Sequence, residues 1–340
     1  MGDVERKFPQ DYLVYDKEHL LSDIESLPLQ IKEGFALGKG VKLPKQTFRN
    51  IIICGMGGSA FPGFLLRAYL PHLPIHVHND YDASPYLTDQ SLVIASSYSG
   101  NTEETLSAYK AARRKGATII SIASGGKLQK LAESDHYPFI QLPKGKQPRA
   151  GYGYFFFALL ALLIQNSLAK DHDKEIKVLL AELDMRALKE RAIILSGEIK
   201  GRLPLIYTDH AFKTIGMRWR TQFNENAKII AHSAILSECN HNEIEAYVHN
   251  TADFIALFLS HAGEHRRIKK RIEITQKVIR KRDIPVVEIA TQGSTQLTKM
   301  FRLIALGDLT SFYLALRFEQ DPSLVPAVEQ LKKDLGPFIV

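Results

Sequence analysis

The sequence predicts an α/β protein in which two domains are each built on a parallel sheet. Its 340 residues suffice for two domains of ordinary size. Short apolar segments alternate with helical segments, which is the pattern of βαβ units. The alternation occurs twice, on either side of a turn-rich stretch at 143–151. We therefore expect an amino-terminal domain at 1–160 and a carboxyl-terminal domain at 161–340.

The first half begins with an expected helix near 19–32 and then contains the first run of strands. Each strand is short and apolar, and most are followed by a glycine- or serine-containing turn and a helix. Gly116 fits the position just after one of these helices, where a left-handed residue commonly ends the helix. We expect strands at 51–54, 75–78, 91–96, 117–123 and 138–141, and helices at 59–70, 102–115 and 127–133.

The second half begins with two helices and then repeats the alternation. A segment rich in Lys and Arg at 265–281 is interpreted as a helix with one solvated face. The last helix is amphipathic, with Val328, Leu331 and Leu335 expected on its buried face. We expect helices at 152–167, 173–197, 210–222, 265–281, 296–317 and 324–335, and strands at 205–207, near 229, at 254–260 and at 286–289.

Composition narrows the class of protein. Apolar residues make up 45% and charged residues 24%, which is ordinary for a globular chain and excludes a mainly disordered one. Two cysteines, Cys54 and Cys239, are too few for a disulfide framework or a cysteine-rich zinc site. Residues 1–10 lack the apolar segment of a signal peptide, and the longest apolar run, 154–164, falls well short of the ~20 residues of a membrane span. We therefore expect a cytoplasmic protein with no membrane partner, and the net charge of +7 favours an anionic ligand.

The first strand ends in a glycine turn, Gly55-Met56-Gly57-Gly58-Ser59, that leads into a helix. Such a turn lets the backbone approach an anion at the helix N-terminus. The same residues also fit a dinucleotide-binding fingerprint, with Asp80 as the acid for the ribose. A purely structural turn is a third interpretation, and this motif alone does not decide among the three.

The third strand ends in a second turn, which carries four hydroxyl groups. Ser97, Tyr98, Ser99 and Thr102 surround the start of a helix. Because loops that follow neighbouring parallel strands share one edge of the sheet, we expect this turn to converge with Ser59 on one phosphate. Capping of the helix by Asn101 and Glu104 is an alternative interpretation that is compatible with anion binding. No Gly-Lys-Ser/Thr follows either turn, which excludes a P-loop.

Together these motifs resemble a sugar-isomerase (SIS) domain. The resemblance lies in 55–60 (GMGGSA) and 97–105 (SYSGNTEET). It implies a flavodoxin-like, five-stranded parallel sheet with helices on both faces, present twice as in phosphoglucose isomerases. Three later segments resemble the compact bifunctional phosphoglucose/phosphomannose isomerases: 148–150 (PRA), 222–228 (QFNENAK) and 240–244 (NHNEI).

The resemblance implies an aldose–ketose isomerase acting through a cis-enediolate without metal or other cofactor. Glu225, expected near a helix start between Asn224 and Asn226, is implied as the base that moves the proton between C1 and C2. His241 is implied in ring opening, in the active site of the neighbouring subunit of a homodimer. Its neighbouring carboxylate in the His-Asn-Glu sequence, Glu243, is expected to tune its pKa.

The remaining expected site residues are cations and phosphate ligands. Arg149 is implied as the stabiliser of the enediolate. The resemblance implies a lysine in the last helix that assists ring opening, and Lys332 is preferred over Lys333 because it lies at the edge of the apolar face. The expected phosphate-binding residues are Gly57, Gly58, Ser59, Ser97, Ser99 and Thr102.

The expected substrates are glucose 6-phosphate and fructose 6-phosphate, with mannose 6-phosphate as a second aldose. Two other functions stay open at this stage: a SIS-type sugar-phosphate-binding regulator and a dinucleotide-binding oxidoreductase. A regulator would carry a separate DNA-binding domain, for which the residues before the first strand are too few, so no nucleic-acid partner is expected. His72, His76 and His78 are closely spaced, but they lie around a strand and are not expected to bind a metal.

Overall fold

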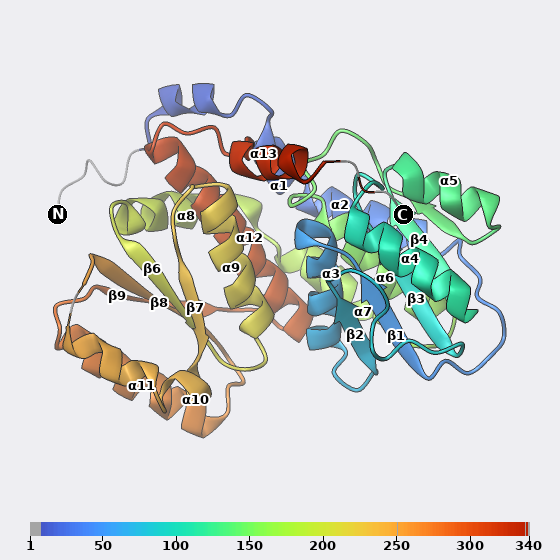
Figure 1. The fold of residues 1–340 in the computed structure, drawn as a ribbon. Helices are drawn as coiled ribbons and strands as arrows, with labels where there is room; N and C mark the ends of the chain where they lie inside the picture. The colour runs from blue at the N-terminus through green and yellow to red at the C-terminus, as the bar shows by residue number, and fades with distance from the viewer. Residues whose placement is uncertain (1–7, 250, 337, 339–340) are drawn as a thin grey trace. The chain divides into compact units, whose positions relative to one another are not determined.

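The computed structural model describes residues 8–249, 251–336 and 338, which form two compact units. The amino-terminal unit comprises Glu25–Asp173 and the segment that starts at Pro326. The carboxyl-terminal unit comprises the segment up to Ile24 and Lys174–Val325. The division expected at 160/161 falls inside one buried helix, α6 (Tyr152–Gln165), so the units divide later along the chain than that pattern suggested. Each unit has one parallel sheet with helices on both faces, which confirms the predicted fold class (Figure 1).

The sheet of the amino-terminal unit has the strand order β2-β1-β3-β4-β5, and all of its pairs are parallel. This is the flavodoxin-like order, in which the crevice for a ligand opens between the carboxyl ends of β1 and β3. The strands are β1 (Asn50–Cys54), β2 (Ile75–His78), β3 (Ser91–Ser96), β4 (Thr118–Ala123) and β5 (Phe139–Gln141). One face packs against α2 (Leu27–Gly38), α3 (Gly57–Tyr69) and α6, and the other against α4 (Glu103–Lys115) and α5 (Gly126–Ser134) (Figure 1).

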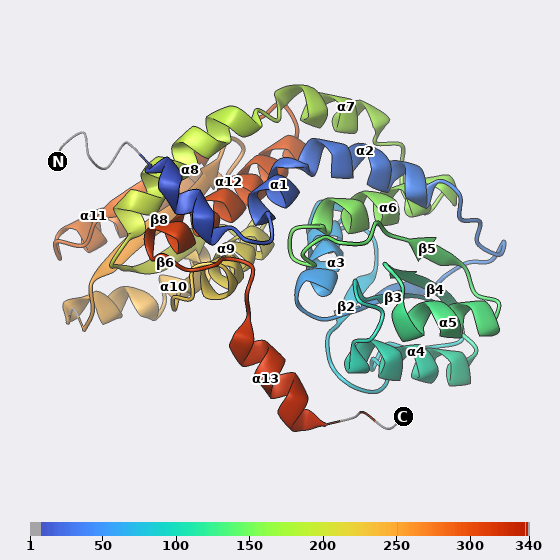
Figure 2. The same cartoon turned by 90° about the horizontal axis from the view of Figure 1, so that it is seen from above.

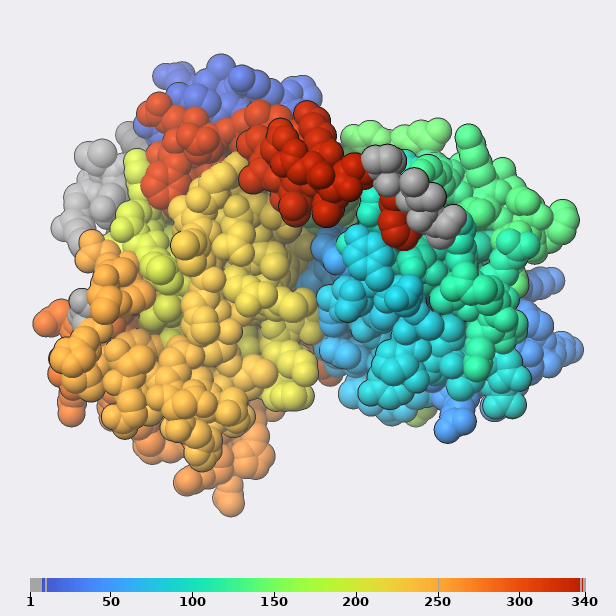
Figure 3. Space-filling model, viewed as in Figure 1, coloured from blue at the N-terminus to red at the C-terminus, as the bar shows by residue number. Residues whose placement is uncertain are grey.

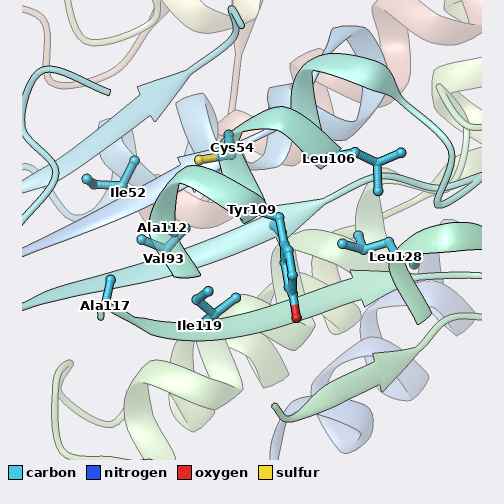
Figure 4. Close-up of a cluster of buried hydrophobic side chains, with 12 residues drawn as sticks. Ile52, Cys54, Val93, Leu106, Tyr109, Ala112, Ala117, Ile119 and Leu128 are labelled. Atoms are coloured by element: carbon cyan, nitrogen blue, oxygen red, sulfur yellow. The ribbon is translucent and has the colours of Figure 1, made fainter. Parts of the chain in front are cut away.

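The core beneath α4 and α5 holds this sheet in place. Figure 4 shows Ile52, Val93 and Ile119 of three adjacent strands facing Tyr109 of α4 and Leu128 of α5, and all five side chains are buried. Every residue of β1 and β3 is buried, as in parallel strands that are covered on both faces. The carboxyl ends of β1 and β3, and therefore the turns that follow them, are fixed by this packing.

The sheet of the carboxyl-terminal unit has the order β7-β6-β8-β9, again entirely parallel. Its strands are β6 (Leu203–Thr208), β7 (His232–Ile235), β8 (Phe254–His261) and β9 (Val286–Thr291). One face packs against α10 (Leu236–Cys239), the 3-10 helix η2 (Glu243–Val248) and α11 (Arg266–Arg280). The other packs against α8 (Met185–Ile199), α9 (Lys213–Glu225) and α12 (Gln296–Arg317), and Figure 2 shows α8 and α12 side by side.

Two of the expected helices are each divided into two in the structure. The helix expected near 19–32 is two helices, because Ser26 and Pro28 begin a new one. The helix expected at 173–197 is also two helices, since the Asp184 side chain caps the second by accepting from the Ala187 amide at 3.0 Å. The remaining elements are η1 (Gln10–Tyr15), α1 (Leu20–Glu25), α7 (Asp173–Glu182) and α13 (Pro326–Leu335).

Two expectations for the second half need correction. The resemblance to a SIS domain implies five strands in the second sheet, but the described residues form four. After β9 the chain enters the 22-residue α12 and then α13, and it adds no further strand in the described residues. The helix expected at 210–222 continues to Glu225, and the strand expected near 229 begins at His232. These shifts place Glu225 at the end of a helix.

The apolar run 154–164 forms the middle of α6 and is almost entirely buried within its own unit, as predicted. In the part of the chain that the structure describes, no helix is both long and apolar enough to span a membrane.

A buried ion pair joins α9 to α12. Arg218 donates from Nε to Asp308 Oδ1 at 2.8 Å and from Nη2 to Asp308 Oδ2 at 2.7 Å. Both side chains are at most 3% exposed. Two parallel hydrogen bonds satisfy the charges that burial removes from water.

We expect Asp308→Ala to lower the free energy of unfolding by about 3–5 kcal/mol, because it leaves the Arg218 guanidinium buried without its counter-ion. Urea unfolding followed by circular dichroism measures the change. The exposed pair Arg186–Glu190 is the control, and Arg186→Ala should cost less than about 1 kcal/mol. The double variant Arg218→Met with Asp308→Leu should recover part of the loss. Equal costs for Asp308→Ala and Arg186→Ala would contradict this account.

Candidate functional site

The turns after β1 and β3 meet at the carboxyl edge of the first sheet. Ser59 Oγ accepts a hydrogen bond from the Tyr98 amide at 2.9 Å, and Ser96 Oγ donates to the Ser59 carbonyl at 2.8 Å. Ser59 is 7% exposed. The convergence of the two turns, predicted from the parallel topology, is confirmed.

Close backbone packing accounts for the second glycine of the first turn. A Cβ atom on Gly58 would lie 3.0 Å from Arg149 Cα and 3.1 Å from the Pro148 carbonyl oxygen. Gly57 has a φ angle of +49° and open space beside it. Met56 precedes α3 in an extended conformation, and no side chain caps this helix. The positive end of the α3 dipole is therefore available to an anion.

The second turn is held by its own hydroxyl groups. Ser97 Oγ lies 2.8 Å from Thr102 Oγ1 and accepts from the Gly100 amide at 3.1 Å. Thr102 is the residue before α4, and its side chain does not cap that helix. Ser99 Oγ accepts from the Asn101 amide at 3.2 Å and is exposed.

The proposed capping of α4 by Asn101 and Glu104 is wrong. Asn101 Oδ1 accepts from the Lys127 amide at 3.0 Å, and its Nδ2 donates to the Ser99 carbonyl at 3.1 Å. Asn101 therefore ties the turn to the start of α5. The two helices without side-chain caps, α3 and α4, thus start from turns that the Ser59–Tyr98 hydrogen bond joins, which favours a bound anion.

Arg149 lies beside the first turn, since its backbone is next to Gly58. It is 6% exposed, in the turn before α6, and its Nη1 donates to Gln147 Oε1 at 3.4 Å. Tyr98 holds the preceding segment, because its hydroxyl donates to the Pro143 carbonyl at 2.7 Å and accepts from the Lys146 amide at 2.8 Å. The Tyr98 hydroxyl thus fastens the segment that leads to the buried Arg149.

Glu225 is the last residue of α9, which corrects the expected helix start. A carboxylate at a helix C-terminus is disfavoured by the helix dipole, so helix stability does not explain it. Glu225 is half-buried. Of the flanking asparagines, Asn226 donates to Ser311 Oγ at 2.9 Å and Asn224 to the Ile229 carbonyl at 2.8 Å, so both fasten the helix end.

His241 is exposed in the turn between α10 and η2. Glu243, expected to tune its pKa, is instead bound to the second sheet. Glu243 Oε1 accepts from the Tyr207 hydroxyl at 2.6 Å, and Oε2 lies 3.0 Å from His232 Nε2. Tyr207 also forms a hydrogen bond with the Tyr247 hydroxyl. The pKa of Tyr207 is raised above its usual value, mainly by burial and further by the electrostatic effect of Tyr247 and Glu243. The carboxylate next to His241 in sequence therefore anchors η2.

The apolar face of α13 is exposed, contrary to expectation. Val328, Leu331 and Leu335 are 44%, 59% and 63% exposed, and the helix has no buried residue. Lys332 and Lys333 are both exposed, so burial does not distinguish them.

The structure gathers one group of expected site residues within the amino-terminal unit: Gly57, Gly58, Ser59, Ser97, Ser99, Thr102 and Arg149. Lys332 is grouped with this unit, whereas Glu225 and His241 belong to the carboxyl-terminal unit. Sequence reasoning missed the fastening role of Tyr98, although its position among the hydroxyls was a signal. It also missed the contacts of Lys228, which belongs to the 222–228 segment but donates to the distant Asp321 carbonyl.

Two other expectations concern metals and the basic helix. Among the described residues, no group of three or more His, Cys, Asp or Glu side chains is placed to hold a metal ion. His76 instead stacks on Tyr86, with ring centroids 4.0 Å apart. The predicted solvated face of α11 is confirmed, since Ile272 and Ile279 are buried while most of its Lys and Arg are exposed (Figure 3, orange).

Comparisons with known proteins agree with this architecture. Residues 47–148 match the SIS domain family, and residues 188–335 match the bacterial phospho-glucose isomerase C-terminal SIS domain. The chain also has the fold of the crystal structure of tagatose-6-phosphate ketose/aldose isomerase from Escherichia coli. That match has a TM-score of 0.66 at 14% identity and covers 89% of this chain and 94% of the other.

Curated relatives are similar over most of the chain. The bifunctional phosphoglucose/phosphomannose isomerase of Caldicellulosiruptor bescii is 38% identical, covering 93% of this chain and 99% of its own. The enzyme of the same name from Thermoplasma acidophilum is 36% identical, covering 85% and 91%. The chain therefore belongs to the bifunctional phosphoglucose/phosphomannose isomerase family and is an isomerase.

Proposed function

We propose that the protein interconverts glucose 6-phosphate and fructose 6-phosphate, with mannose 6-phosphate as a second aldose. The observation that carries this proposal is the hydrogen bond that joins the turns after β1 and β3, where two helices without side-chain caps start and the Arg149 backbone packs against Gly58. The relatives named above bear both activities in their names.

The phosphate group is held by the two turns. Ser59, Ser97, Ser99 and Thr102 supply neutral hydroxyls, and Gly57 and Gly58 let the backbone approach the anion. Ser97 Oγ and Thr102 Oγ1 already lie 2.8 Å apart, so little ordering is needed when the ligand binds. Neutral donors suit a phosphate that must also leave. Anchoring the phosphate positions C1 and C2 for the chemical step.

Glu225 moves the proton. In the open-chain aldose it removes the proton from C2, and the electron pair left behind forms the C1=C2 bond of a cis-enediolate as C1=O becomes a C1 oxyanion. The hydroxyl proton passes from O2 to O1, and Glu225 returns its proton to C1 as the C2 carbonyl forms. Arg149 stabilises the negative oxygens of the enediolate. Glu225 ends α9 and is half-buried, and the side chains of both flanking asparagines fasten this helix end, which supports a role as a positioned base.

His241 and Lys332 open the sugar ring. Both are exposed in the single chain, which supports a site completed by a second copy, with His241 acting in the neighbouring subunit of a homodimer. Glucose 6-phosphate and mannose 6-phosphate differ only at C2, so they share one enediolate. One base therefore serves both if the open-chain sugar rotates before its proton is removed.

We also propose that the enzyme acts in the cytoplasm. Cys54 and Cys239 are free and buried, and burial raises the pKa of each thiol to about 12, so neither is poised for redox chemistry.

A coupled assay with fructose 6-phosphate and mannose 6-phosphate, tested separately in the presence of EDTA, examines the proposed reaction. We expect turnover of both sugars. If neither sugar reacts with or without the chelator, the isomerase assignment fails. Turnover that EDTA abolishes would contradict the metal-free mechanism.

We expect Glu225→Gln to lower kcat about 10²–10⁴-fold while leaving the KM for fructose 6-phosphate nearly unchanged, because the amide keeps the shape but removes no proton. The same coupled assay measures both constants. Glu175→Gln on α7 is a control that removes one carboxylate from the same unit and should retain activity. A Glu225→Gln enzyme with more than about half of the normal kcat would exclude Glu225 as the base.

We expect Gly58→Ala to raise the KM for fructose 6-phosphate at least about tenfold, because its Cβ would press on the Arg149 backbone and displace the phosphate turn. Gly40→Ala is the matched control, since a Cβ there meets no atom within 4 Å. Steady-state kinetics of the two variants should differ in KM. Identical KM values would show that the turn does not hold the substrate.

A further inference from the structure

The turn that follows α9 contains an unusual backbone conformation. Lys228 lies three residues after the last residue of the helix and has a φ angle of +57°. Non-glycine residues seldom adopt this left-handed conformation, and glycine is the common choice after a helix. A lysine therefore adopts this conformation at a cost in free energy that the contacts of its side chain can offset.

The Lys228 ammonium group is bound by backbone carbonyl groups from two places in the chain. Nζ donates to the Asn226 carbonyl at 3.0 Å, to the Asp321 carbonyl at 2.7 Å and to the Pro322 carbonyl at 3.3 Å. An ammonium group has three donors, so it can bond to all three of these acceptors at once. Because the donor is charged, these bonds are stronger than those between neutral groups.

The first of the two segments joined by Lys228 is the end of α9, which bears Glu225. The neighbouring Asn226 side chain donates to Ser311 Oγ of α12 at 2.9 Å, so the helix end is also fastened to the core of the unit. Lys228 adds a second attachment, because it donates to the Asn226 carbonyl. Both attachments act on the residue that directly follows Glu225.

The second segment is the turn at 321–323. Asp321 Oδ1 accepts from the Ser323 amide at 2.8 Å, and Pro322 and Ser323 are buried. Along the chain this turn leads into α13, which bears Lys332. Lys228 therefore bonds directly to the segment that precedes one proposed active-site residue and to the helix end that carries another.

We propose that Lys228 is a positioning residue, which holds the helix end bearing Glu225 and the turn preceding α13 in one fixed arrangement. The inference rests on the proposed function of Glu225. A purely structural role would favour glycine, which adopts the left-handed conformation without strain, and the exposed Lys228 side chain contributes little to the core. The lysine therefore contributes through the hydrogen bonds that its ammonium group donates to the Asn226, Asp321 and Pro322 carbonyls.

Lys228→Gly separates the two roles, because it relieves the backbone while it removes the ammonium group. We expect kcat for fructose 6-phosphate to fall at least about tenfold, with KM changed by less than about twofold, because the base is displaced and the phosphate turn is untouched. The melting temperature should not fall. Asp283→Gly is the matched control, because Asp283 follows α11 and also has a φ angle of +57°. The helix α11 packs on the other face of the sheet from α9, so the Asp283→Gly enzyme should keep a normal kcat.

A chemical rescue tests whether the ammonium group itself is responsible. Lys228→Cys should lose kcat like Lys228→Gly, and alkylation with 2-bromoethylamine should restore it by forming an aminoethyl side chain of lysine's length. Cys54 and Cys239 are buried and burial raises the pKa of each to about 12, so they should not react, which mass spectrometry verifies.

Each result of these experiments either supports or overturns the positioning role of Lys228. Loss of kcat in Lys228→Gly without loss of stability, with rescue of Lys228→Cys, supports the inference. Normal kcat in Lys228→Gly, an equal loss in Asp283→Gly, or failure of the aminoethyl rescue overturns it. If the unmodified enzyme turns over neither sugar, the proposed function fails and this inference fails with it. An active enzyme with an equally active Lys228→Gly variant refutes only the positioning role.

Discussion

The hydrogen bond from the Tyr98 amide to Ser59 Oγ, 2.9 Å long, is the contact on which the site in the amino-terminal unit depends. It joins the turns after β1 and β3 at the point where the strand order of the sheet reverses. The buried strands beneath set the position of each turn, and this bond sets their separation. With it in place, α3 and α4 start from joined turns, and the Arg149 backbone packs against the first of these turns.

The second sheet repeats the topology but not this chemistry. At the end of β6, Asp209 Oδ1 accepts from the Phe212 amide at 2.9 Å, and Oδ2 lies 3.1 Å from Nε2 of His261, which ends β8. The hydrogen bond to Asp209 raises the pKa of His261 against the opposing effect of burial. Glu264 lies beside them and accepts from the His261 amide at 3.0 Å. A carboxylate thus occupies the helix start where the first sheet leaves room for an anion.

Sequence reasoning recovered what local pattern and topology determine. Alternation predicted the parallel sheets, and the shared edge of parallel strands predicted that Ser59 meets the second turn. The sequence predicts a helix that ends at 222 and a helix start near Glu225, whereas α9 packs on α12 and continues through Glu225. Periodicity showed which residues of α13 share a face, but not whether anything covers that face. The Lys228 contact could not be predicted, because it joins residues 93 positions apart.

The central claim is that the phosphate group binds at the carboxyl edge of the first sheet and not at that of the second. Titration with sorbitol 6-phosphate, an open-chain phosphosugar that cannot isomerise, tests it by amide chemical shifts in ¹⁵N NMR spectra. The account predicts saturable shifts at Gly58, Ser59, Tyr98 and Gly100, the residues of the two joined turns. Shifts confined to Asp209, Phe212 and His261, with the first-sheet amides unchanged, would contradict it.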